Sequence, residues 1–164
     1  MKYIILFLAL LFSPGMYVQA QEDTPDYPGD NELKINAAYL LAGFAEITYE
    51  RMLRDDSAIG ISAGFALDNN IDYRFAAIPY YRLYFGKKRA AGFFVEGNAN
   101  FFSERNFESD TEFGAGLGLA IGGKFINAKG WVAELFLGLG RNLVNNDNIS
   151  EAYPRVGILV GKRF

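Results

Sequence analysis

The sequence contains no histidine and no cysteine among its 164 residues. Without histidine there is no Ser–His nucleophile pair, and both the commonest general base and the commonest metal ligand are missing. Without cysteine, thiol catalysis, Cys-ligated metal sites and disulfide bonds are excluded. Ser–His and thiol catalysis and His- or Cys-ligated metal sites are therefore excluded, and we expect no catalytic residue, no cofactor and no metal ion.

Long apolar runs and basic clusters are also scarce. Beyond residue 20, no apolar run approaches the roughly 18 residues that a transmembrane helix needs. Once Lys2 is left out with that first segment, 15 of the 16 basic residues and all 19 acidic residues remain, giving a net charge of −4. No basic stripe marks a nucleic-acid partner. A chain of this kind can enter a membrane only as strands closed on themselves.

The first 20 residues form a pattern of their own. Lys2 precedes nine apolar residues, Ile4–Phe12, and Val18-Gln19-Ala20 is a small-x-small cleavage site. This pattern predicts a secretory signal peptide at 1–20, with a buried N-terminal helix as the alternative. Residues 21–32 are acidic and contain Pro and Gly, which predicts a flexible periplasmic leader.

The rest of the chain alternates with a period of two. Side chains of a strand point to opposite faces in turn, so this period indicates strands. The terminal segment is an example, because Val156, Ile158 and Val160 share one parity and Arg155 and Arg163 the other. We predict an all-β fold at 33–164, an eight-stranded antiparallel up-and-down transmembrane β-barrel. The predicted strands are Leu33–Leu41, Ala45–Met52, Ala58–Leu67, Tyr73–Phe85, Gly92–Phe102, Glu112–Phe125, Trp131–Leu143 and Tyr153–Phe164.

The connections differ in character on the two sides of the predicted barrel. Three are short and mostly basic: 54–56, 86–89 and 127–130. Three others are Asn-rich or acidic, and two of these are longer: 68–70, 103–110 and 145–150. Short periplasmic turns and longer outer loops are typical of the bacterial outer membrane, so we expect that location, with both termini in the periplasm. Loops 103–110 and 145–150 could bind an unknown extracellular ligand, and Asp68, Asp72 and Asp147 could alternatively bind Ca²⁺.

The two faces of each strand indicate which side points inward. In the seventh strand, Leu135, Leu137 and Leu139 alternate with Glu134 and Gly138. The bulky face is apolar and the polar face is rich in glycine, so the polar face fits the concave interior of a barrel. The apolar face is then left outside, where a bilayer would contact it.

Charged residues recur on the predicted inner face. Buried charges are tolerated when they are paired and hydrogen-bonded, so we predict an internal ion-pair network rather than a solvated face. Glu46 with Glu50, or Glu96 with Glu134, could instead form paired carboxylates, but an arginine partner for each is the preferred interpretation. The predicted network consists of Glu46, Glu50, Arg74, Arg82, Glu96, Lys124, Glu134, Arg155 and Arg163, with Glu112 on the same face.

Aromatic residues gather near the strand ends. Such residues form girdles at both interfaces of membrane barrels. Phe44, Phe65, Phe101 and Phe113 fall near the longer loops, and Pro79, inside the fourth strand, predicts a β-bulge. The girdle predicted near the short turns consists of Tyr49, Tyr81, Phe85, Phe93, Phe125, Trp131 and Phe164.

Several strings resemble one family over nearly the whole chain after residue 32. They are Tyr49-Glu50-Arg51, IPYYRLYF (78–85), GFFVEGN (92–98), GLGLAIGGKF (116–125), VAELFLGLGRN (132–142) and YPRVGILVGKRF (153–164). Together they resemble small outer-membrane β-barrels of unknown function from Bacteroidetes-type bacteria, and in size the chain is similar to OmpA-type and OmpX-type barrels. The resemblance implies fold and membrane location but supplies no catalytic residues. Lys162 departs from it, because such barrels usually place an aromatic residue there.

These features favour a non-enzymatic integral protein of the cell outer membrane with a side-chain-filled interior and a structural or surface-interaction role. Its expected partners are outer-membrane lipid and, through the C-terminal strand, the barrel assembly machinery. The alternatives are a lipid-modifying barrel enzyme that works without histidine, a narrow pore, and a soluble periplasmic barrel.

Overall fold

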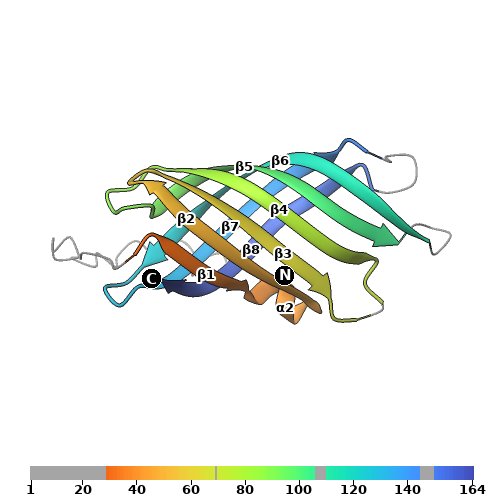
Figure 1. The fold of residues 1–164 in the computed structure, drawn as a ribbon, viewed down its shortest axis with the longest axis horizontal. Helices are drawn as coiled ribbons and strands as arrows, with labels where there is room; N and C mark the ends of the chain where they lie inside the picture. The colour runs from red at the N-terminus through yellow and green to blue at the C-terminus, as the bar shows by residue number, and fades with distance from the viewer. Residues whose placement is uncertain (1–28, 69, 106–109, 145–149) are drawn as a thin grey trace, which may run out of the picture.

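Eight antiparallel strands close into a barrel in the computed structural model, which describes residues 29–68, 70–105, 110–144 and 150–164 (Figure 1). Each strand pairs with the next one along the chain, and β1 pairs with β8, so the order is up-and-down. The predicted fold class is therefore confirmed as an all-β, eight-stranded antiparallel barrel. The strands are β1 (Asn31–Asn36), β2 (Phe44–Arg54), β3 (Ser57–Ala66), β4 (Tyr73–Tyr84), β5 (Gly92–Arg105), β6 (Thr111–Ile126), β7 (Trp131–Asn142) and β8 (Ala152–Arg163).

The connections alternate between the two ends of the barrel as predicted, but the connection 85–91 is longer than the predicted short turn 86–89. At one end, called the turn end here, lie the connections 55–56, 85–91 and 127–130, the start of β1 and the end of β8 (Figure 1). At the other, the loop end, lie the remaining connections. For the second to eighth strands, predicted and observed bounds agree within a few residues.

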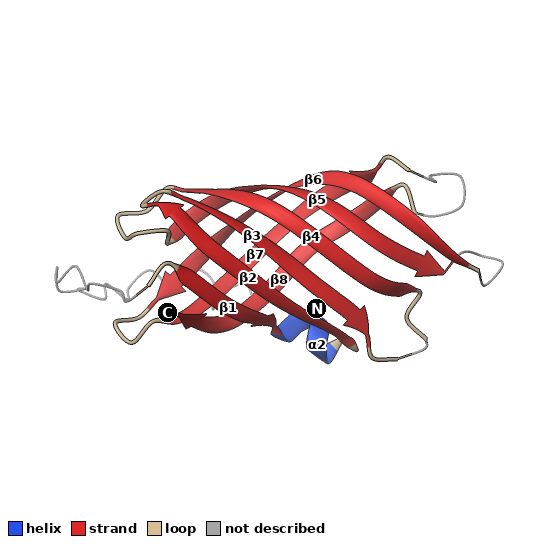
Figure 2. Ribbon diagram, viewed as in Figure 1, coloured by secondary structure: helices blue, strands red, loops and turns tan. Residues whose placement is uncertain are grey.

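The first predicted strand, Leu33–Leu41, is wrong in its second half. There β1 ends at Asn36 and a short helix follows, α2 (Ala37–Leu41), coloured blue in Figure 2. The Asn36 side chain caps this helix by accepting a hydrogen bond from the Tyr39 amide at 3.3 Å. Gly43, with φ +85°, ends it and donates its amide to the Leu40 carbonyl at 3.1 Å.

The predicted leader, 21–32, extends too far. Asn31 and Glu32 already belong to β1, because Asn31 pairs with Arg51 and Glu32 pairs with both Glu50 and Arg163. The barrel therefore begins at 31 rather than 33. Residues 1–28, which include the predicted signal peptide at 1–20, lie outside the described residues.

The bulge predicted at Pro79 is also wrong. Pro79 keeps regular register with Ile61 of β3, and the pairing of β4 with β5 has the same register before and after it. Proline lacks an amide donor, and its place coincides with a short interruption of the β4–β5 pairing rather than an inserted residue. The β4–β5 register shifts instead between Tyr73 and Phe75, which makes Arg74 the extra residue.

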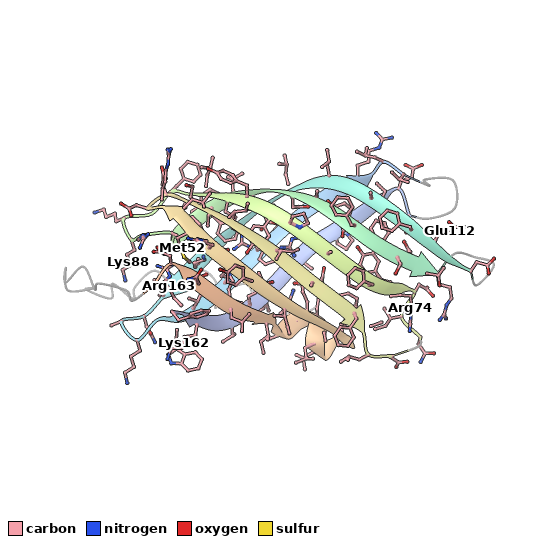
Figure 3. All side chains as sticks on the ribbon, viewed as in Figure 1. Met52, Arg74, Lys88, Glu112, Lys162 and Arg163 are labelled. Atoms are coloured by element: carbon pink, nitrogen blue, oxygen red, sulfur yellow. The ribbon has the colours of Figure 1, made fainter. Side chains whose placement is uncertain are left out.

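Side chains alternate across the wall, with polar groups inside and bulky apolar groups outside (Figure 3). On β7, Glu134 is 2% exposed while the neighbouring Leu135 is 60% exposed. Glycines on the inner face make room for this filling, because a Cβ built on Gly138 would lie 2.2 Å from the Leu119 carbonyl oxygen and 2.5 Å from the Ala120 Cβ. Gly97 is on the outer face, and a Cβ there would meet nothing within 4 Å.

These two glycines provide a matched test of the packed interior. Gly138→Ala is expected to destabilise the barrel by about 1–3 kcal/mol, because the added methyl forces the backbone of β6 and β7 to shift. Gly97→Ala should leave stability unchanged. Urea unfolding of the refolded barrel, followed by tryptophan fluorescence, measures both variants. Equal unfolding midpoints for the two would contradict a tightly filled interior.

Candidate functional site

Of the residues that the structure describes, ten charged side chains lie inside the barrel, and each is at most 3% exposed. Five are carboxylates and five are cations, so the interior can be electrically neutral. Such a balance matters because a buried charge without a partner is strongly destabilising. We call this set the ionic core: Glu32, Lys34, Glu46, Glu50, Arg82, Glu96, Lys124, Glu134, Arg155 and Arg163.

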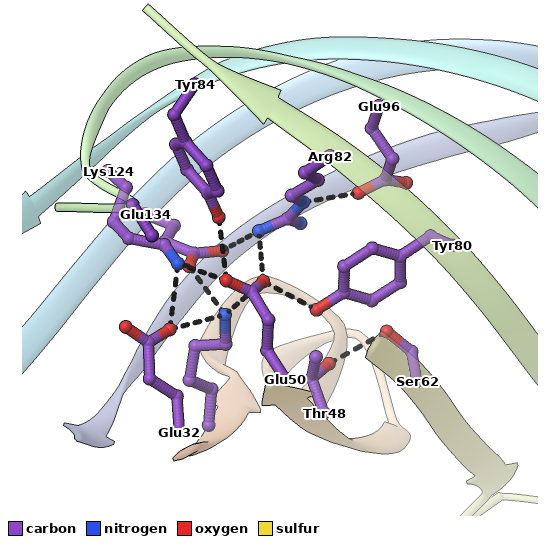
Figure 4. A network of polar contacts seen from close by, with 12 residues as sticks. Glu32, Thr48, Glu50, Ser62, Tyr80, Arg82, Tyr84, Glu96, Lys124 and Glu134 are labelled. Atoms are coloured by element: carbon purple, nitrogen blue, oxygen red, sulfur yellow. Dashed lines mark hydrogen bonds and ion pairs between the residues drawn. The ribbon is translucent and has the colours of Figure 1, made fainter. Parts of the chain in front are cut away.

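Glu50 lies at the centre of the ionic core (Figure 4). Its carboxylate accepts hydrogen bonds from Lys34 Nζ at 2.9 Å and Arg82 Nη1 at 3.0 Å, and also from Lys124 Nζ. Two tyrosine hydroxyls complete the set, Tyr84 at 2.7 Å and Tyr80 at 2.8 Å. The five donors come from β1, β4 and β6, so this one carboxylate of β2 connects strands on opposite sides of the barrel.

Three carboxylates of the ionic core resemble a metal site by distance alone. Oxygens of Glu32, Glu50 and Glu134 lie within 4.8 Å of one another. Lys34 Nζ, however, bonds to all three, at 3.0, 2.9 and 2.6 Å respectively. Lys124 Nζ also reaches Glu32 at 2.8 Å and Glu134 at 3.3 Å. Two ammonium groups of the chain itself therefore stand where a divalent cation would bind.

Arg82 connects the centre of the ionic core to Glu96. Its Nε is 2.7 Å from a Glu96 oxygen, and its Nη1 is 2.8 Å from a Glu134 oxygen. The guanidinium also lies over aromatic rings, 4.2 Å from the Phe94 centroid and 4.5 Å from that of Tyr80. Ion pairs and cation–π contacts together compensate for removing this charge from water.

Arg155 extends the ionic core toward the loop end. Its Nε is 3.0 Å from Glu96 and its Nη1 is 3.7 Å from Glu46, while Nη2 donates to the Ser62 hydroxyl at 3.2 Å. The Phe136 ring lies 4.7 Å from its guanidinium carbon. Glu46 and Glu96 thus each face an arginine, and the geometry favours ion pairing over paired carboxylates.

Arg163 closes the ionic core at the turn end. It pairs with Glu32 at 2.7 Å and donates to the carbonyls of Arg89 at 3.0 Å and Ala90 at 3.1 Å. Both carbonyls belong to the 85–91 connection, and the Ala90 amide bonds to the Asp55 carbonyl at 2.6 Å. Ala90 is fully buried, so this connection folds over the end of the barrel and covers the interior.

The structure brings together eight of the nine residues of the predicted network and corrects the ninth. Arg74 and Glu112 both lie at the loop end (Figure 3). There the Nη1 of Arg74 donates to the carbonyls of Asp68 at 3.1 Å and Ile71 at 3.4 Å. The reason is local: Arg74 is the extra residue of the β4 bulge, and a bulge changes the direction of a side chain.

Sequence reasoning missed Glu32 and Lys34. Glu32 lies within the predicted leader, and Lys34 is the one charged residue of the first predicted strand, Leu33–Leu41. A signal for both exists, because Glu32, Lys34 and Asn36 alternate with Leu33 and Ile35 in the same way as the other strands.

All seven residues of the predicted girdle lie on the outer surface, from Tyr49 at 39% exposed to Phe125 at 71%. Lys162 lies beside them, with its ammonium 5.5 Å from the centroid of the Trp131 ring. Phe44, by contrast, was expected near the loop-side girdle but is 7% exposed and packs inside, because it has the parity of Glu46. The girdle residues are Tyr49, Tyr81, Phe85, Phe93, Phe125, Trp131 and Phe164.

Comparison with family models, with curated proteins and with solved structures finds no match to this chain. The resemblance to small Bacteroidetes-type barrels therefore stays a prediction. Among the described residues, no helix has the length and apolar character needed to cross a membrane.

Proposed function

We propose that this protein is an integral, non-catalytic barrel of the bacterial outer membrane. The observation that carries the proposal is the inversion of polarity across the wall. Ionised side chains are enclosed, while large apolar side chains such as Leu119 (68%), Leu137 (63%) and Leu139 (73%) are exposed on the outside. Soluble monomers rarely expose contiguous apolar surface beyond a few hundred Å². A bilayer would cover such a belt, and the aromatic residues near the turn end suit its headgroup level.

The filled interior favours a structural or surface-interaction role over conduction. Arg82, Arg155 and Phe94 are fully buried within the lumen, and the 85–91 connection covers the turn end. A narrow pore would need an open path through these side chains. Each carboxylate of the ionic core has a cationic partner, which argues against a free acid or base for lipid modification.

The surface for interaction would be the loop end. The predicted ligand loops 103–110 and 145–150 lie in the connections that follow β5 and β7, except that Ser103, Glu104 and Arg105 belong to β5. The described flanks of these two connections meet. There the Ser150 hydroxyl is 3.4 Å from a Glu104 carboxylate oxygen. Residues 106–109 and 145–149 lie outside the described residues. In this proposal the two loops act as one surface for an extracellular ligand, and β8 presents the chain to the barrel assembly machinery.

Fractionation and gel mobility test the proposal directly. The protein should be recovered with outer membranes, partition into detergent, and migrate differently on a gel before and after heating, because a closed barrel resists unfolding by detergent. Reconstituted in planar bilayers, it should give no steady single-channel steps. A chain that stays monomeric in plain buffer would reject the membrane location, and regular conductance steps would reject the filled lumen.

A further inference from the structure

The first strand is too short to complete the barrel wall. It pairs with β2 only as far as Ile35 with Ile47, and with β8 only as far as Asn36 with Leu159. Both neighbours continue beyond these pairs toward the loop end, β2 to Phe44 and β8 to Ala152. Between them no described strand completes the wall, and α2 lies there instead, in contact with both (Figure 2).

Part of the open edge of β8 is satisfied without a partner strand. The Asn36 side chain accepts from the Ile158 amide and donates to the Val156 carbonyl, each at 3.3 Å. Backbone N–H and C=O groups alternate in direction along a strand, so those of Val156 and Ile158 and the carbonyl of Pro154 all point toward the gap. Proline has no amide hydrogen that would need a partner at this edge. At these positions the edge of β8 therefore needs no partner strand.

A cavity of about 330 Å³ lies behind α2, inside the loop-end half of the barrel. Its walls include the rings of Tyr39, Phe44 and Tyr73, and the centroids of Phe44 and Tyr73 are 5.9 Å apart. Pro154, which is exposed on the outer surface, also lines the cavity. The cavity therefore extends to the part of β8 that borders the gap beside α2.

Two polar side chains mark the inner end of this cavity. Asn100 is 1% exposed, and its Nδ2 donates to the Tyr73 hydroxyl at 2.5 Å. Its Oδ1 has no hydrogen-bond partner among the described residues, which is costly for a buried carbonyl oxygen. The second is Glu46, with one carboxylate oxygen bonded to Asn36 and the other 3.7 Å from Arg155. An apolar cavity with one unsatisfied acceptor beside a carboxylate is selective for a particular ligand chemistry.

We propose that this cavity binds the alkyl chain of a small amphiphile with a neutral hydroxyl at its end, admitted through the gap between β2 and β8. The chain would lie against the aromatic walls, and the hydroxyl would donate to Asn100 Oδ1. An anionic head group has no hydrogen to donate to Asn100 Oδ1, and its charge would be costly to bury in this apolar cavity. On the outer side of α2, Leu40 is 46% and Leu41 91% exposed, so the gap opens onto an apolar surface. The route from a bilayer rests on the proposed membrane location.

A homologous series of alcohols tests the binding site. The barrel in lipid nanodiscs, with its isoleucine methyl groups labelled, is titrated with 1-hexanol, 1-octanol and 1-decanol and followed by NMR. The Ile78 methyl, which lines the cavity, should shift in a saturable way, while that of Ile126 in the apolar cluster at the turn end should not. Affinity should rise about fourfold per added methylene until the cavity is full. Decanoate should bind at least tenfold more weakly than 1-decanol.

Two variants separate the cavity from general partition into the bilayer. Ala76→Phe adds a ring to the cavity wall and should abolish the saturable shift, whereas Ala133→Phe, on the outer surface, should leave it unchanged. Asn100→Leu should weaken binding of 1-decanol and so narrow, but not remove, the preference for alcohol over decanoate. An unchanged titration in Ala76→Phe, or equal affinity for decanoate and decanol in the unmodified protein, would overturn the site. Because the nanodisc sample is already membrane-embedded, that failure leaves the proposed location intact.

A matched pair of substitutions tests the route of access. Pro154 lies on the gap side of the cavity and Ile71 on the loop side. Pro154→Trp should slow alcohol exchange at Ile78 at least tenfold with little change in affinity, and Ile71→Trp should not. The opposite pattern would assign access to the loop end and reject the gap.

Discussion

Replacing Arg82 by leucine is expected to lower the free energy of unfolding by about 3–5 kcal/mol, the range measured when one partner of a buried ion pair is removed. Arg82 is fully buried and pairs with Glu50, Glu96 and Glu134 at 2.7–3.0 Å. Without the guanidinium, each of these three carboxylates loses one ion pair but stays buried. Urea unfolding of the barrel in detergent micelles, monitored by the heat-dependent gel shift, measures the loss.

Arg54→Leu is the matched control, because Arg54 is an exposed arginine at the turn end of β2. It should unfold at nearly the same urea concentration as the unmodified protein. Arg82→Lys should unfold at a urea concentration between those of Arg82→Leu and Arg54→Leu. Lysine keeps the charge, but it lacks the separate nitrogens with which arginine bonds to several carboxylates. If Arg82→Leu unfolds together with Arg54→Leu, the ionic core does not stabilise the barrel.

Leu119→Arg is expected to destabilise the membrane-embedded barrel by about 2–4 kcal/mol, because a cation facing lipid near the midplane is costly. Leu119 lies in the middle of β6 with its side chain 68% exposed on the outer surface. In water the same change would be harmless, because an exposed apolar side chain is replaced by a charged one. The sign of the effect therefore distinguishes a membrane barrel from a soluble one. Folding yield into lipid vesicles measures it.

Leu143→Arg provides the control for depth. Leu143 is 59% exposed and follows the end of β7 at the loop end. Near an interface the penalty for arginine falls to about 0–1 kcal/mol. If the vesicles accept Leu119→Arg and Leu143→Arg with the same yield, the outer belt is not in contact with lipid, and the proposed location is wrong.

The strands and their faces were predictable because the signal is local and repeated. Glu134 and Leu135 differ by one position and point to opposite sides, and the same alternation recurs in every long strand. The large share of glycine on the polar face indicated the concave side. For these reasons strand count, order and orientation followed from the sequence, as did most members of the ionic core.

What could not be predicted depends on single residues with two possible roles. Asn36 continues the parity of β1, yet its side chain caps α2 and so ends the strand. Arg74 has inward parity, but the β4 bulge turns it toward the Asp68 carbonyl. Pro79 can interrupt pairing without shifting the register. The alternation of residues cannot distinguish the two roles of such a residue, because the role depends on contacts with other parts of the fold.

The ionic core also has a consequence for the time course of folding. Glu32 and Arg163 are 131 residues apart in sequence, and Lys34 and Glu134 are 100 apart. Contacts of such long range form slowly, because much chain entropy is lost before they contribute. A half-assembled sheet would hold these charges unpaired, and in a bilayer that state is especially costly. Pairing of β8 with β1 brings Arg163 to Glu32, so closure of the barrel and neutralisation of these charges become one cooperative event.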